Sequence, residues 1–528
     1  MPIIQRQNTL RHLRLAPLLI LSSCNSMPGV DLAPAYEPPE FIVPASWRGA
    51  SPFVEAKPSD GEIRPDWWRM FKDPVLDRIE EQAMAENADL QAAAERFVQA
   101  RDLMMKARSR MLPQLTIGLD ASDNKESEAA LFRGPLNPIY DTSVADRAGA
   151  SWEPDLWYAI RNETKARSYL AQQKAAEFAL ARLSLQAEIA SDYFTLRGYD
   201  AQGDIYSQSI SYYKQSLNIV NERYLGKIAS ELDVARAKAL LYNTEAKALE
   251  VQGEREVVEH AIAILANTAP ASFRIPQAAG FRIMPLKIPR RLPSTLLERR
   301  PDIATSEREM AQANREIGVA RAAFYPKVEF RLDGGFEDRG INLVKLANSF
   351  WSYGSAVSLP VFDGGLRRAQ LQRSWSVYRE TEDRYRTTVL NAFREVEDGL
   401  SLTNRLNAAA KKLDAAVVAT QQTQNLTMDL YKGGLNSSLD LIYAQVATLT
   451  ARIDAAQVKA RVLKSSVDLI RSLGGGWDRG KLPKEDEIQP FDSLQYDGLE
   501  KPPEAGGIDV PADDNTRNNN LANGGRAL

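Results

Sequence analysis

The chain has 528 residues, with 66 basic and 69 acidic side chains and a formal net charge of −3. Nucleic-acid-binding proteins typically carry an excess of basic residues, which this chain lacks, so we expect no nucleic-acid partner. Two histidines and one cysteine are too few for a zinc or copper cluster, and the sequence has no phosphate-cradling glycine loop or nucleophile elbow. We therefore expect no enzyme activity, no cofactor and no metal site.

The N-terminus has the layout of a secretory signal peptide. Three arginines precede a short apolar run, and small residues lie just before Cys24, the one cysteine of the chain. This pattern is typical of a bacterial lipobox, in which the cysteine becomes the first mature residue and carries lipid such as palmitate. We predict a signal peptide over 1–23 and lipidation of Cys24, with an incidental buried thiol as the alternative. In lipoproteins of this kind, an aspartate directly after the cysteine favours retention in the inner membrane. This chain has Asn25 at that position, which favours the outer membrane.

A unit of about 200 residues is repeated along the chain. The sequence ARSRMLPQLTIG at 107–118 corresponds to ARAAFYPKVEFR at 320–331, and ERYLGKIASELDVARAKALL at 222–241 corresponds to DLYKGGLNSSLDLIYAQVAT at 429–448. The sequence therefore predicts an N-terminal segment, a first repeat, a proline-rich connector, a second repeat and a disordered tail, over residues 24–75, 76–269, 270–301, 302–482 and 483–528 respectively.

Two long stretches without proline predict helices. No proline occurs from Asp155 to Ala269 or from Val361 to Leu482, and a proline inside a helix costs about 3 kcal/mol or more. Apolar residues in these stretches alternate between spacings of four and three, which is coiled-coil-like; examples are Tyr206, Ile210, Tyr213, Leu217, Val220 and Tyr224. A helix from Asp155 to about Glu222 would span roughly 100 Å. This length favours an extended helical tube over an ordinary helical bundle.

Four short segments alternate with period two. Apolar Leu115, Ile117 and Leu119 alternate with small or polar residues, and so do Val328, Phe330 and Leu332 in the second repeat, each followed by a returning segment. Each segment has about the length of a tilted transmembrane strand. We predict β-hairpins at about 114–153 and 327–360, with lipid on one face and a water-filled lumen on the other. A half-buried soluble sheet gives the same alternation, but the export signal favours the membrane.

Four strands cannot form a pore alone. The smallest spanning barrels have about eight strands, and an open sheet edge in hydrocarbon leaves backbone groups unpaired. The chain must therefore assemble into a symmetric ring. Three copies of four strands would give twelve, although the periodicity alone does not choose three copies over two or four.

Several landmarks lie along the two repeats: WEPDLW at 152–157, LPSTLLERRPDI at 292–303 and PVFDGGLRRAQL at 360–371. With the paired repeat sequences, they resemble the TolC-like outer membrane efflux proteins, in particular the lipid-anchored NodT-type branch that serves resistance-nodulation-division pumps. The resemblance covers about residues 24–482.

This resemblance implies a mixed membrane α/β fold and a homotrimer. A twelve-stranded β-barrel in outer membrane lipid continues into a periplasmic α-helical barrel, and the connector and termini form an equatorial region. It also implies passive conduction, with a periplasmic adaptor (membrane fusion) protein and an inner-membrane pump as partners.

Glycines interrupt both long helical stretches at matching places. Gly226 and the pair Gly433-Gly434 allow a helix to end and turn, so each stretch is predicted to be a helical hairpin with its tip there. By resemblance the tips bind the adaptor, and the candidate residues are Leu225, Gly226, Lys227, Ile228, Lys432, Gly433, Gly434 and Leu435. Lys227 stands where the second repeat has Gly434, which leaves the shape of the first tip open.

The resemblance also places a gate beside the second tip. Tyr431 and Asn436 fall where a tyrosine and an arginine form closing contacts, and Asp440 and Tyr443 fall where two aspartates ring the aperture. Carboxylates in a narrow ring repel one another and raise one another's pKa, whereas tyrosines fill the opening with ring area. We therefore expect one acidic ring and one aromatic ring. The closing contact of the family's arginine is absent, because Asn436 carries no charge. Asp440 has a second reading as a capping residue near a helix start, and its repeat partner Asp233 is expected to be structural.

The sequence thus favours the outer membrane exit duct of a drug-type tripartite pump. The same channel could serve a type I polypeptide secretion system or a metal efflux system, although the chain has no Met-rich or His-rich patch. A lipid-anchored coiled-coil scaffold without a pore is the third hypothesis. Such a scaffold has no reason to keep four alternating segments of membrane length.

Overall fold

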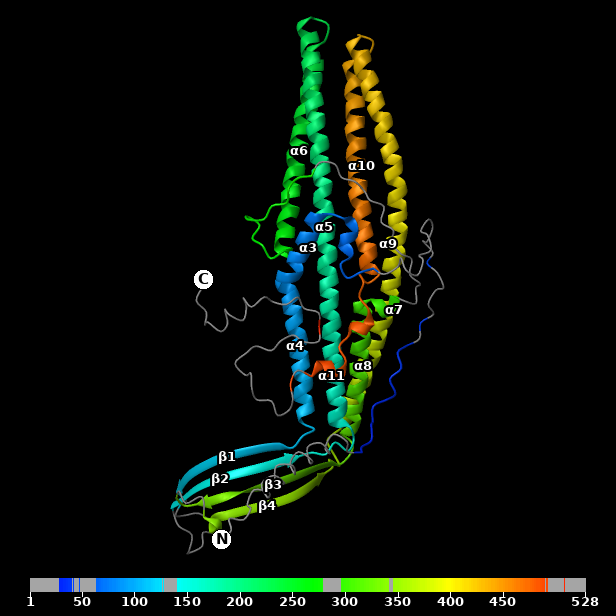
Figure 1. The fold of residues 1–528 in the computed structure, drawn as a ribbon. Helices are drawn as coiled ribbons and strands as arrows, with labels where there is room; N and C mark the ends of the chain where they lie inside the picture. The colour runs from blue at the N-terminus through cyan, green and yellow to red at the C-terminus, as the bar shows by residue number, and fades with distance from the viewer. Residues whose placement is uncertain are drawn as a thin grey trace, which may run out of the picture.

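The computed structural model describes residues 28–39, 41, 47, 63–125, 127, 140–278, 296–340, 345–489, 491 and 508. The predicted signal peptide and Cys24 lie outside these residues. The protomer is elongated, with a four-stranded sheet at one end and the tips of two helical hairpins at the other (Figure 1). In the described part of the chain, the helices lack an apolar stretch that could cross a membrane.

The sheet is antiparallel and follows the chain order β1-β2-β3-β4. Its strands are β1 (Gln114–Lys125), β2 (Tyr140–Trp152), β3 (Lys327–Asp338) and β4 (Ser349–Ser358). The register pairs Leu115 with Ala150, Ala150 with Leu332, and Leu332 with Tyr353, so one apolar face runs across all four strands. The predicted period-two alternation is therefore confirmed.

The apolar face of the sheet is uncovered in the protomer. Ile117, on β1, is 91% exposed. The opposite face carries charged and polar side chains, where Arg147 lies 3.7 Å from Asp120 and Ser143 donates a 2.7 Å hydrogen bond to Glu337. β1 and β4 are both edge strands, because neither has a second neighbour in the chain. The sheet is therefore one segment of a larger structure.

Helices leave the sheet in two equivalent sets, one in each repeat. The first set is α3 (Pro74–Glu86), α4 (Ala88–Ser109), α5 (Ala159–Leu225) and α6 (Glu231–Leu265); the second is α7 (Leu296–Arg299), α8 (Pro301–Ala322), α9 (Leu366–Lys432) and α10 (Ser438–Ser472). α5 and α9 each have 67 residues, and α6 and α10 each have 35. Equal lengths in both repeats confirm the predicted long helical hairpins.

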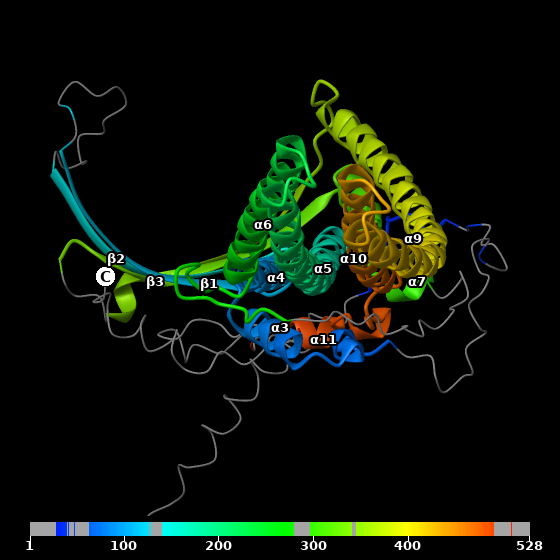
Figure 2. The same ribbon diagram turned by 90° about the horizontal axis from the view of Figure 1, so that it is seen from above.

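The largest apolar core lies where α3 and the short helix η1 (Trp67–Phe71) pack on the middle of α5, and it continues to α9 and α10. Trp67 and Tyr193 are fully buried there, and Phe71 lies 4.6 Å from Phe194 between ring centroids. Viewed along the helices, α3 lies on one side of the layer formed by α5, α6, α9 and α10 (Figure 2). This core fixes the middle of the protomer and leaves the tips to be held by contacts of their own.

The predicted start of the disordered tail is wrong. Within the predicted tail, residues Glu485–Ile488 form α11, which follows the short helix η4 (Arg479–Lys481) at the end of the second repeat. Ile488 is fully buried against Phe97 and Met104 of α4, and Gln489 accepts a 2.6 Å hydrogen bond from Arg108. Ile488 and the hydrogen bond to Gln489 dock this polar segment on the helices, and composition alone hides this.

Candidate functional site at the helix tips

The two helical hairpins turn with the same backbone geometry. Ile228 donates a 2.8 Å backbone hydrogen bond to Arg223, and the corresponding Leu435 donates one of 2.9 Å to Leu430. Lys227 has a φ of 59° and Gly434 has a φ of 76°, so both occupy the left-handed region. The first tip therefore has the same shape as the second, despite lysine in place of glycine.

The helices that follow the tips begin with matching capping boxes. In the second tip, the Ser437 hydroxyl accepts a hydrogen bond from the Asp440 N–H at 3.2 Å, and the Asp440 carboxylate accepts from the Ser437 N–H, also at 3.2 Å. Asp440 thus occupies the capping position considered from the sequence, while its side chain remains exposed. Capping of the helix explains why an aspartate stands at this position, whether or not it also contributes to a gate.

The tips of the two hairpins are joined by Arg223, a residue that no sequence pattern singles out. The Arg223 guanidinium lies 4.7 Å from the centroid of the Tyr431 ring, and its Nη1 donates a 2.5 Å hydrogen bond to the Tyr431 carbonyl oxygen. Tyr431 is buried, and burial raises the pKa of its hydroxyl. Tyr431 is therefore held by an arginine of the first repeat, whereas the position considered from the sequence, Asn436, is part of the second.

A second polar contact joins the hairpins. The Ser438 hydroxyl donates a hydrogen bond to the Asp233 carboxylate, which also caps α6 through Ser230. The hydrogen bond from Ser438 holds the pKa of Asp233 below its usual value. Asp233 therefore links α6 to α10, beyond the structural role expected from its place in the repeat.

An apolar cluster lies beneath these two contacts. It consists of buried residues from both hairpins: Val220, Val234, Ala237, Met428, Tyr431 and Leu441. Burial of such side chains stabilises the contact between hairpins by about 1.5–3 kcal/mol per large residue. The polar contacts thus sit at the rim of a small core that holds the tips together.

The remaining predicted tip residues point outward from the protomer. Leu225 and Ile228 of the first tip are 72% and 69% exposed, and Leu435 of the second is 77% exposed. Gly226, Lys432 and Gly433 are also exposed, whereas Asn436 is partly buried. Tyr443 is 65% exposed on α10. Each hairpin therefore ends in an accessible apolar surface.

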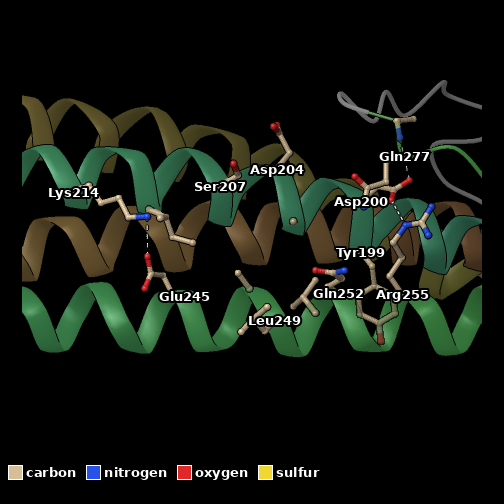
Figure 3. Close-up of a pocket in the computed structure, with 15 residues that line it drawn as sticks. Tyr199, Asp200, Asp204, Ser207, Lys214, Glu245, Leu249, Gln252, Arg255 and Gln277 are labelled. Carbon is tan, nitrogen blue, oxygen red and sulfur yellow. Dashed lines mark hydrogen bonds and ion pairs between the residues drawn. The ribbon is translucent and has the colours of Figure 1, made fainter.

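A buried ion network supports the hairpins near their middle. Asp200 of α5 accepts hydrogen bonds from Arg197 at 2.8 Å and from Arg255 of α6 at 2.6 Å, and Arg255 donates to the Ile275 carbonyl at 2.6 Å. A groove of about 820 Å³ lies beside this network, between α5 and α6, and the Lys214–Glu245 ion pair closes its other end at 3.0 Å (Figure 3). The network fastens the start of the connector to the first hairpin.

Known proteins match along both repeats. The family described as outer membrane efflux protein matches residues 80–268 and 292–475. Outer membrane protein OprJ of Pseudomonas aeruginosa is 28% identical over 473 residues, which cover 88% of this chain and 95% of that protein. Nodulation protein T of Rhizobium leguminosarum bv. trifolii is 27% identical over 470 residues, covering 87% and 96% of the two chains. The solved structure of the outer-membrane channel OprN has a TM-score of 0.78 and 26% identity, covering 84% of this chain and 99% of that chain.

Proposed function

The chain belongs to the outer membrane efflux protein family and is an outer membrane exit duct of a tripartite efflux pump, and we propose that contacts between its helix tips close the periplasmic end of the duct. The resemblance drawn from the sequence is confirmed at the level of this family and fold. OprJ is an outer membrane protein, and OprN is an outer-membrane channel. The gate, its residues and the lipid anchor are our own proposals.

The observation that best supports a gate at the tips is the contact between Arg223 and Tyr431. It connects the end of α5 to the end of α9, and the Asp233–Ser438 hydrogen bond connects the starts of α6 and α10. When both contacts form, the second hairpin cannot move away from the first at its tip. Breaking them leaves the apolar cluster and, farther from the tips, the hydrogen bonds of Gln445 with Tyr213 and Ser216 as restraints. The tips then separate more easily and the aperture widens.

The aperture itself is assigned to side chains that the protomer leaves exposed. Asp440 and Tyr443 lie on consecutive turns of α10, and both are exposed. In a ring of three protomers, they supply the proposed acidic and aromatic levels. Asn436 adds no charge beside them. The charged contact between the hairpins comes from Arg223 instead.

The unpaired surfaces of the protomer support its assembly with further copies, which we propose number three. Both sheet edges are open, and α6 carries an exposed apolar stripe at heptad-like spacing: Tyr242, Leu249, Val257 and Ile264. Exposed apolar stripes of this kind mark interaction surfaces. Closure of the sheet into a barrel and pairing of α6 with a neighbouring protomer bury these surfaces together.

The lipid anchor on Cys24 is consistent with where the described N-terminus lies. The Val30 N–H donates a 2.9 Å hydrogen bond to the Leu156 carbonyl, between β2 and α5 at the base of the barrel. Cys24 lies six positions before Val30, and an extended chain over six positions spans about 20 Å. Lipid on Cys24 can therefore reach the bilayer that the barrel spans.

The adaptor and the inner-membrane pump are proposed as partners at the hairpin ends. The exposed apolar residues Leu225, Ile228 and Leu435 present a surface for the adaptor at the end farthest from the sheet. The energy for transport then comes from the pump, and the duct conducts passively.

Conductance of the purified channel in a planar bilayer tests the gate. We expect the Arg223→Gln variant, combined with Asp233→Asn, to conduct at least several-fold more than the wild type. Lys238→Gln is the matched control, because Lys238 is an exposed cation on α6 away from both contacts. Equal conductance in the wild type and the double variant would show that these contacts do not close the duct.

A further inference from the structure

Lys227 adopts a backbone conformation that a glycine adopts at the corresponding position of the second tip. Its φ of 59° lies in the left-handed region, where a Cβ crowds the backbone and glycine avoids the strain. Gly434 occupies the corresponding place in the second tip, with the same hydrogen-bond pattern around it. Glycine would therefore serve the fold of the first tip better than lysine does.

The Lys227 ammonium has no ion pair or hydrogen bond within the part of the protomer that the structure describes. The neighbouring cations differ: Arg223 is bound to Tyr431, and the Lys432 ammonium lies 3.9 Å from Asp429. Lys227 is exposed at the apex between Leu225 and Ile228, two exposed apolar side chains. A free charge flanked by apolar surface is thus displayed at the far end of the molecule.

We propose that Lys227 determines which adaptor the channel accepts, by pairing with a carboxylate on the adaptor while Leu225 and Ile228 make apolar contacts with it. This inference rests on the proposed function of the tips. Backbone strain at an exposed site persists where the side chain has a use that offsets it. An ammonium at the centre of a contact attracts an acidic partner and rejects a basic one, which is how charge sets specificity.

The second tip cannot make this contact, because Gly434 has no side chain. Tips with and without an unpaired apical ammonium therefore alternate around a ring of protomers. The matching adaptor presents carboxylates to the apex of the first tip of each protomer and needs none at the apex of the second.

Binding to purified adaptors tests the proposal. The full-length channel in detergent is immobilised, and the dissociation constant of each periplasmic adaptor of the host bacterium is measured by interferometry. We expect Lys227→Glu to weaken binding of the cognate adaptor about tenfold or more. Lys227→Gly is expected to weaken it about threefold to tenfold, with a smaller difference at 1 M salt, where exposed charges are screened. Lys238→Glu, a remote exposed cation on α6, is the control and leaves affinity unchanged.

Two further readouts separate a partner contact from a structural role. Lys227→Gly is expected to raise the thermal unfolding midpoint, because it removes the left-handed lysine, while it weakens binding. Changing the facing carboxylate of the adaptor to lysine is expected to restore binding to Lys227→Glu. Adaptor binding that is equal in wild type and Lys227→Glu overturns this inference alone. Failure of every adaptor to bind the wild type overturns the proposed role of the tips as well.

Discussion

Asp233 is the residue through which pH can act on the tips. Its carboxylate accepts hydrogen bonds from Ser438 of the other hairpin and from Ser230 of its own capping box. These bonds favour the charged form, and the one from Ser438 is the main reason why the pKa lies below the ordinary value. A group whose pKa is lowered in the folded state contributes stability above its ordinary pKa and loses it as the pH falls through the lowered value.

The first prediction concerns acidification of the channel. The ordinary pKa of aspartate is about 3.9, so the Asp233–Ser438 contact should persist from pH 7 to about pH 4 and weaken below that. We expect bilayer conductance to stay flat over the upper range and to rise below about pH 4. Asp233→Asn should remove this rise, whereas Asp440→Asn, which leaves the contact between hairpins intact, should retain it. A rise that survives in Asp233→Asn would assign the response to another group.

The second prediction concerns the buried ion network in the middle of the first hairpin. The side chains of Arg255 and Asp200 are 8% and 1% exposed and lie 2.6 Å apart. Without Arg255, Asp200 keeps its pair with Arg197, but Glu259, which is 5% exposed and lies 3.3 Å from Arg255, loses its cation. Loss of one partner of a buried pair costs about 3–5 kcal/mol. We expect Arg255→Met to lower the thermal unfolding midpoint of the purified channel strongly.

Lys247→Met is the matched control for this network. Lys247 lies on the same helix and pairs with Glu250 at 2.6 Å, but both side chains are more than half exposed. Exposed ion pairs contribute little to stability because both charges stay solvated, so the midpoint should change little. Similar losses in the two variants would mean that the network of Asp200 is not the support of the hairpin.

At the scale of single elements, the sheet and the hairpins follow directly from periodicity. The strands alternate with period two, and glycine marks both tips, so their places could be predicted from neighbouring residues. Arg223 could not be found in this way. Its contact with Tyr431 joins two repeats, and its repeat counterpart is Leu430. Contacts between distant elements depend on how helices pack, and no local pattern records them.

The third prediction tests the face of a strand. Ile117 lies on the apolar face, and the adjacent Thr116 lies on the polar face with Gly149 opposite. A charge on the lipid-facing side of a barrel costs about 2–4 kcal/mol near the middle of the bilayer. We expect Ile117→Arg to reduce the yield of assembled channel in the outer membrane, and Thr116→Arg to be tolerated in the lumen. Equal yields of the two variants would contradict a lipid-facing role for Ile117.

At the scale of the whole molecule, the repeat determines the architecture. Each repeat supplies one β-hairpin and one long helical hairpin, and the equal helix lengths keep both tips at the same height (Figure 1). The repeat could be predicted from paired sequences, because each unit needs the same residues at the same turns. The docking of the chain near Ile488 could not, since one buried side chain in a polar segment leaves no periodic signal.

The fourth prediction concerns the assembly that this architecture requires. Leu249 is exposed in the protomer, in the middle of the apolar stripe of α6, so a change there does not disturb the fold of a single chain. A carboxylate at that position must lose its water if α6 packs against a neighbouring protomer, and burial of an unpaired charge is costly. We therefore expect light scattering in detergent to give the mass of three chains for the wild type and of one chain for Leu249→Glu. Glu250→Gln, at an adjacent exposed position, should keep the mass of three chains. A trimer that tolerates Leu249→Glu would place the contact between protomers on another face of the helices, whereas a wild-type mass of one or two chains would leave too few strands to close a barrel.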